Sequence, residues 1–167
     1  MVDRSGKPCS ANVSLVSGEG GSLGVGTTGV DGNEFVFSND LFGHARMMGP
    51  LTLQATTEDD RVAVLGGIDA MRPEDIEALV LTVEPGAKLE LSLDGVYETL
   101  RCRLLHDGVI FEDFTLRKTQ PAREGGPAGP RLIQLYSGGG SDMFVRDERA
   151  LSLRAGDAIS VAFVVER

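Results

Sequence analysis

Apolar residues alternate with small or polar residues along most of the chain, and this period of two predicts β-strands rather than helices. The clearest case is the last segment, where Ile159, Val161, Phe163 and Val165 share one face of the expected strand. The same alternation recurs at residues 12–15, 34–38, 51–56, 88–93 and 151–153. About ten to twelve short strands at regular spacing indicate an all-β fold, either a two-sheet β-sandwich or a distorted barrel, and of the two we expect the sandwich.

Residues 58–85 interrupt this pattern with the one helix that the sequence predicts. An acidic turn leads into an expected strand at 61–65, and two glycines end it. Pro73 then stands where a first helical position belongs, with Glu74 and Asp75 near the positive end of the helix dipole. An apolar strand is expected at 79–83, so the short helix should connect two neighbouring β segments.

Turn residues divide the rest of the chain. Asp94-Gly95 is a strong hairpin signal and predicts a return strand at 97–105. Residues 119–130 are rich in Pro and Gly and are expected to form a loop. Further strands are expected at 109–116, 131–136 and 143–146. Because no repeat or linker divides the 167 residues, we expect a single domain over 1–167, with 1–10 as a loose N-terminal tail.

The charge balance limits the partners. Sixteen Lys and Arg residues against 25 Asp and Glu residues give a net charge of −9, which disfavours nucleic acid and anionic membranes. Cations, neutral groups and other proteins are the expected partners. No apolar run is long enough to predict a membrane span. The two cysteines and the polar N-terminus favour a reduced, cytoplasmic location.

Catalytic motifs are poorly supported. Residues 20–24 fit the G-x-S-x-G pattern of a hydrolase elbow, but the flanks lack the strand and helix that this elbow needs. His44 and His106 are the only histidines, and neither they nor the two cysteines have the spacing of a zinc site. We therefore expect a protein that is not an enzyme.

Oxygen ligands are the most promising chemistry in the sequence. Asn39 and Asp40 follow the expected strand at 34–38, and Glu58, Asp59 and Asp60 precede the one at 61–65. Calcium takes six to eight oxygen ligands from flexible loops, so a calcium site is predicted if these loops meet at one end of a sandwich. The alternative is that the acids are simply solvated.

Three segments, residues 34–40, 59–64 and 72–83, resemble the TerD family of tellurium-resistance and general stress proteins. Members of that family have a strand ending in Phe-Val-Phe-Tyr-Asn-Asn, a Gly-Asp-Asp-Glu turn, and a short helix that opens with Pro and an acidic pair. The resemblance implies a calcium-binding β-sandwich that acts as a binding module in stress response. Arg61 stands where the family has its Glu, and Asp40 where it has its second Asn.

A different resemblance gives an alternative function. Residues 151–161 are similar to the last hairpin of trimeric jelly-roll domains, and the small residues on one face of the final strand suit packing against another subunit. This predicts a structural or assembly protein that forms homo-oligomers through its C-terminal strands. Residues 84–91 are also similar to the middle of the PilZ dinucleotide-binding barrel, but the arginine pair and Asp-x-Ser-x-x-Gly motif of that family are missing.

Overall fold

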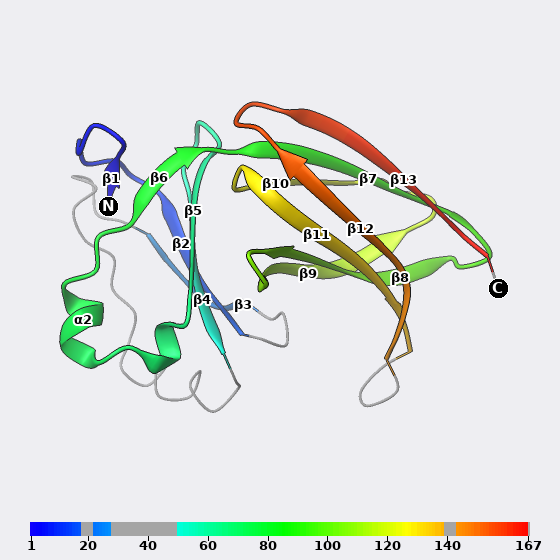
Figure 1. Cartoon of the computed structure of the whole chain (residues 1–167), viewed down its shortest axis with the longest axis horizontal. Coiled ribbons are helices and arrows are strands. Elements are labelled where there is room, and N and C mark those ends of the chain that lie inside the picture. Colours follow the sequence, from blue (N-terminus) through cyan, green and yellow to red (C-terminus); the bar gives the residue numbers. More distant parts are fainter. Residues whose placement is uncertain (18–21, 28–49, 139–142, 167) are drawn as a thin grey trace.

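The computed structural model describes residues 1–17, 22–27, 50–138 and 143–166, and most of these residues lie in β-strands (Figure 1). An all-β sandwich is confirmed, and the described residues include one short α-helix. The N-terminal strands are β1 (Val2–Asp3), β2 (Asn12–Ser17), β3 (Ser22–Thr27), β4 (Leu51–Thr56), β5 (Arg61–Gly66) and β6 (Thr82–Pro85). The C-terminal strands are β7 (Ala87–Gly95), β8 (Thr99–His106), β9 (Val109–Arg117), β10 (Ala122–Gly126), β11 (Gly129–Ser137), β12 (Phe144–Leu153) and β13 (Ala158–Val165).

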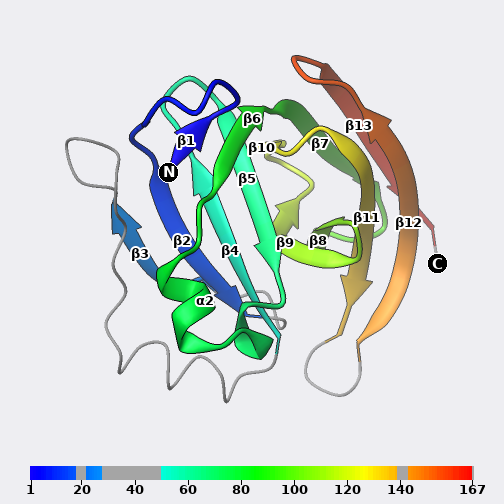
Figure 2. The same cartoon turned by 60° about the vertical axis from the view of Figure 1, so that its left-hand side comes forward.

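The N-terminal strands form one six-stranded sheet in the order β1-β6-β5-β4-β2-β3. A 3-10 helix, η1 (Ile68–Ala70), and helix α2 (Pro73–Glu77) connect β5 to β6 at one end of this sheet (Figure 2). Pro73 starts α2, as predicted, because its fixed φ suits the first turn. The strand after α2 begins at Thr82 rather than at Leu79, where it was expected.

The first residues do not form the loose tail that was expected. Val2 and Asp3 pair in parallel with β6, and the Met1 side chain is 6% exposed. Met1 packs in a hydrophobic cluster with residues of β2, β4 and β6. Burial of this apolar side chain holds the N-terminus on the sheet.

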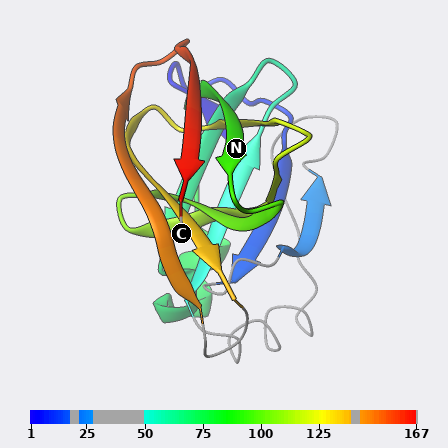
Figure 3. The same cartoon turned by 90° about the vertical axis from the view of Figure 1, so that its right-hand side faces the viewer.

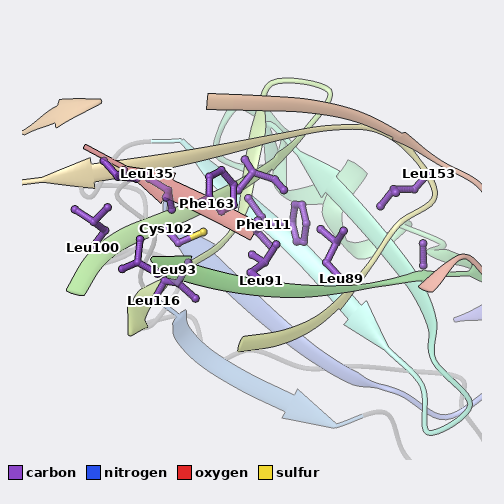
Figure 4. Close-up of a cluster of buried hydrophobic side chains, with 14 residues drawn as sticks. Leu89, Leu91, Leu93, Leu100, Cys102, Phe111, Leu116, Leu135, Leu153 and Phe163 are labelled. Atoms are coloured by element: carbon purple, nitrogen blue, oxygen red, sulfur yellow. The ribbon is translucent and has the colours of Figure 1, made fainter. Parts of the chain in front are cut away.

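The C-terminal strands form two facing sheets, β10-β7-β13 and β12-β11-β8-β9. Their inner faces enclose a second hydrophobic cluster, which includes Leu91 and Phe163 among its fully buried members (Figure 4). β13 runs parallel to β7 in continuous register, and Phe163 lies opposite Leu93. Thus all of the described buried hydrophobic residues except Val16 and Val62 fall into two clusters, one within residues 1–83 and one within 87–165.

Three expected connections are wrong. Asp94-Gly95 does not join a hairpin, because β7 and β8 belong to different sheets and the chain crosses between them. The segment 119–130 is not all loop, since β10 pairs with β7 inside it. β12 and β13 also belong to different sheets, so the expected C-terminal hairpin is a second crossing. Each error concerns which strands pair, which local sequence does not determine.

No helix in the described part of the chain is long and apolar enough to cross a membrane.

Candidate functional site

The acidic turn predicted as a ligand site connects β4 to β5. The Thr57 hydroxyl lies 2.5 Å from Asp59 Oδ1, and the Arg61 amide donates to Thr57 Oγ1 at 3.0 Å. Asp60 has a φ of 61°, a left-handed conformation that Asp adopts more readily than most residues. These bonds, together with that of the Thr57 amide to the Arg61 carbonyl at 2.9 Å, shape the turn so that Glu58, Asp59 and Asp60 are exposed.

Two of the three acids already have cationic partners. Asp59 receives the Arg61 Nε at 2.9 Å, and Asp60 lies 2.6 Å from the Lys88 ammonium at the start of β7. The Thr57 hydroxyl and then the Arg61 guanidinium lower the pKa of Asp59, which keeps this carboxylate ionised. The second pair connects the acidic turn to the C-terminal sheets.

The other predicted ligands, Asn39 and Asp40, lie outside the described residues. Within the described ranges, no group of three His, Cys, Asp or Glu side chains is placed to hold a metal ion. The calcium site at Asn39, Asp40, Glu58, Asp59 and Asp60 therefore stays a prediction.

Hollows open on both sides of the acidic turn. One, of about 570 Å³, is lined by Cys9, Glu58 and Asp59 among others. Another, of about 430 Å³, lies over β7, β10 and β13, where Glu90 pairs with Arg123 at 3.0 Å. Its lining mixes uncharged residues with charges of both signs, and two of its acids, Asp60 and Glu90, are paired with Lys88 and Arg123, so it is not a strongly charged site for a cation or an anion.

Two carboxyl groups that sequence reasoning missed come together beside the N-terminal sheet. Glu112 of β9 lies opposite the buried Leu104, and Glu124 of β10 lies opposite the buried Leu89. Both side chains therefore face the inside of the C-terminal sandwich. Gln54 of β4 reaches across, and its Nε2 lies 3.4 Å from Glu112 Oε1.

Burial raises the pKa of both carboxyl groups. Desolvation raises the pKa of Glu112, and desolvation together with the negative charge of Glu112 raises the pKa of Glu124 to about 7. Burial first, and then the charges of Glu124 and Asp113, raise the pKa of the Cys102 thiol to about 12. No local sequence pattern marks this cluster, because Glu124 lies in the segment expected to be a loop.

A third acid, Asp113, is fully paired. Its side chain is 1% exposed and lies between two arginines of β8, with Arg101 Nε at 2.5 Å and Arg103 Nε at 2.7 Å. Arg103 also lies over the Tyr136 ring, 5.1 Å from its centroid. This cluster stabilises the β8–β9 pair.

Arg131 is a buried cation that holds the start of β7. Its side chain is fully enclosed and donates to the Pro127 carbonyl at 3.0 Å and to the Ala87 carbonyl at 3.3 Å. It lies over the Phe111 ring, and burial lowers its pKa to about 10. A Cβ at Gly126 would come within 2.8 Å of this guanidinium, so the close approach requires glycine.

The C-terminal strand β13 is an edge of a different kind from the others. Six strands form the edges of the three described sheets. β1 has two residues. β3, β9 and β12 contain register shifts, and β9 and β12 also carry charged residues. β10 is five residues long with two charges. These are the features with which natural proteins protect sheet edges.

β13 has none of these features. Its eight residues contain no charge, Gly or Pro, and its register with β7 has no bulge. No second strand pairs with it among the described residues. Val164 is 60% exposed. Figure 3 shows β13 (red) and β12 (orange) on the face of the molecule turned toward the viewer.

No protein-family model matches the chain, and no curated protein matches it. It is similar in structure to the Bacillus anthracis TIE protein, with 9% identity over 99% of this chain and 32% of that one, at a TM-score of 0.42. It is also similar to GBS52, the minor pilin in the gram-positive pathogen Streptococcus agalactiae, with 11% identity over 97% of this chain and 85% of that one, at a TM-score of 0.38. These similarities do not test the TerD resemblance, which stays a prediction.

Proposed function

We propose that this chain is a non-enzymatic binding and assembly module that takes up an extended strand of a partner along the free edge of β13. The observation that carries the proposal is that β13 alone among the described edge strands lacks every common protection against pairing. Unpaired N–H and C=O groups along a regular strand are a template for another strand.

The direction of the backbone groups identifies the residues that would bind. The amides of Lys88 and Val96 donate to the carbonyls of Asp157 and Val165, at 2.8 and 3.1 Å, so odd-numbered residues point their backbone groups toward β7. Neighbouring residues of a strand point to opposite sides. The residues that direct their N–H and C=O groups to the free edge are therefore Ala158, Ser160, Ala162 and Val164.

The side chains specify what kind of strand fits. Ile159, Val161, Phe163 and Val165 face the core, and the residues between them are small or, at Val164, apolar. A charged side chain on the incoming strand would find no counter-charge on β13. The Arg149 guanidinium of β12 does lie over the Phe163 ring, but it is already paired with Asp147 at 3.0 Å. An uncharged strand rich in β-branched residues is therefore the expected partner.

Binding of a fluorescently labelled peptide tests whether the free edge of β13 takes up a strand. The sequence of residues 158–165, flanked by lysines for solubility, is titrated with the protein and followed by fluorescence anisotropy. Ala162→Pro removes an N–H that faces the free edge but none that faces β7, so we expect binding to weaken about tenfold, since an unmet carbonyl costs about 1–3 kcal/mol. Ala162→Ser keeps the N–H and should bind like the unmodified protein.

Val164→Pro is a second test of the same edge, in case the first proline distorts the strand. Circular dichroism and thermal unfolding establish that both proline variants remain folded. A peptide that binds folded proline variants as tightly as the unmodified protein, or that does not bind at all, contradicts the proposal.

Calcium binding at the acidic turn is the second candidate. Its support is that Asp59 is held ionised and exposed beside a hollow of about 570 Å³. A calcium ion there has to displace Arg61 from Asp59, or Lys88 from Asp60. The TerD-family stress role and the cytoplasmic location stay predictions.

A further inference from the structure

We infer that the strand taken up by β13 is β13 of a second copy of this chain, running antiparallel about a two-fold axis. This inference rests on the proposed function and names its partner. Joined in this way, the two three-stranded sheets β10-β7-β13 become one continuous sheet across the dimer. A two-fold contact of this kind uses the same surface on both copies and closes on itself.

The alternation along β13 suits pairing with itself. Two residues directly opposite in an antiparallel pair have their side chains on the same face, so inward residues must meet inward residues. Of the alignments that satisfy this requirement, two give the longest overlap, and they are centred on Val161 and on Ala162. Centred on Ala162, the inner face pairs Ile159 with Val165 and Val161 with Phe163. The outer face of that alignment pairs Ser160 with Val164 and Ala162 with itself.

Both alignments bring only uncharged side chains together over seven of the eight residues, and the eighth, Val165 or Ala158, lies opposite Asp157 or Glu166 of the other copy. Cross-strand pairs of β-branched and aromatic residues stabilise a sheet, whereas like charges directly opposite destabilise it. The net charge of the whole chain opposes association, because each copy carries −9. Salt screens repulsion between exposed charges, so dimerisation should strengthen as ionic strength rises.

Assembly should stop at the dimer. The joined sheet ends at β10 on both sides, and β10 is short and carries Arg123 and Glu124. The facing sheet ends at β12, where residues 146–149 are all charged, and at β9, which contains a register shift. These protected edges disfavour the addition of further copies.

Sedimentation velocity over a concentration series tests the inference directly. We expect a monomer–dimer equilibrium whose dimer fraction is greater in roughly 500 mM salt than in roughly 20 mM salt. Ala162→Pro should remain monomeric at concentrations where Ala162→Ser forms dimers.

Substitutions of opposite charge at residue 162 test whether β13 of one copy pairs with β13 of the other. Residue 162 lies opposite either itself or residue 160 of the partner in the two alignments, so Ala162→Lys and Ala162→Glu should each weaken self-association. Mixing these two variants should give a heterodimer about tenfold tighter than either homodimer, because opposite charges replace like charges across the axis. The matched variants Ala150→Lys and Ala150→Glu, on the exposed part of β12, should show no such difference.

The outcomes separate this inference from the proposed function. A protein that stays monomeric in both salt conditions but still binds the β13 peptide overturns the second copy as partner and keeps strand uptake. A dimer that Ala162→Pro leaves unchanged, with no preference for the Lys and Glu mixture, overturns the inference by placing the dimer contact elsewhere. A chain that neither dimerises nor binds the peptide overturns both.

Discussion

Replacing Glu124 by Gln should stabilise the protein above neutral pH. The Glu124 carboxyl faces the inside of the C-terminal sandwich, near Glu112, and its pKa is raised to about 7 from 4.5. Because the folded pKa lies above the unfolded one, ionisation is unfavourable in the folded protein. Stability is therefore lost as pH rises from about 4.5 to about 7 and remains low at higher pH.

The magnitude follows from the pKa difference. At about 1.4 kcal/mol per pKa unit, the full shift corresponds to roughly 3 kcal/mol, and partial solvent contact of Glu124 reduces this to about 1–2 kcal/mol. Glutamine has nearly the same shape but no charge, so the variant should gain this amount at pH 8. Near pH 4.5 the two proteins should be about equally stable, since the carboxyl is protonated there.

Urea unfolding at pH 5, 6, 7 and 8, followed by circular dichroism, measures the free energy of unfolding of the unmodified protein and of Glu124→Gln as a function of pH. Glu112→Gln should move the loss of stability to lower pH, because it removes the charge that helps to raise the pKa of Glu124. Glu98→Gln replaces an exposed acid and serves as the control. The reasoning is refuted if Glu124→Gln lowers the free energy of unfolding at pH 8, or if it raises it equally at every pH.

Three further predictions concern other parts of the fold. Gly95→Ala should lower the free energy of unfolding by about 3 kcal/mol in urea titrations, because φ is +99° and the new Cβ would lie 2.1 Å from the Val165 carbonyl oxygen; a change below 1 kcal/mol would contradict this. Asp113→Asn should cost about 3 kcal/mol in the same assay, since it leaves two arginines without their anion; an unchanged unfolding midpoint would show that the pair is not needed. In calorimetric titrations, Lys88→Gln should tighten calcium binding about threefold to fivefold by removing the ammonium that competes for Asp60. Absence of calcium heats in both proteins would refute the metal prediction at this turn.

Local order was predictable from the sequence because it depends on side-chain direction within a few residues. Alternation at 51–56, 88–93 and 158–165 marked β4, β7 and β13, since successive side chains of a strand point to opposite faces. Pro73 marked the start of α2, because proline fixes φ and lacks an N–H that the first turn does not need. The acidic turn before β5 was also recognised from its residues alone.

Pairing between distant strands was decided only by the tertiary structure. Asp94-Gly95 permits a tight reversal whether the next strand pairs with β7 or crosses to the facing sheet, so the turn signal did not distinguish these outcomes. β10 contains two glycines, yet the edge of β7 organises it as a strand.

By itself, then, the sequence determined that residues 158–165 form a strand with one apolar face. Packing of segments far apart in the chain decided the rest. It placed this strand at the edge of a sheet, with its outer backbone groups unpaired among the described residues, and it brought Glu112 and Glu124 together beside Gln54. The physical reason is that strand conformation is set by neighbouring residues, whereas exposure, pKa and free hydrogen-bonding groups are set by whatever else comes to lie beside the strand.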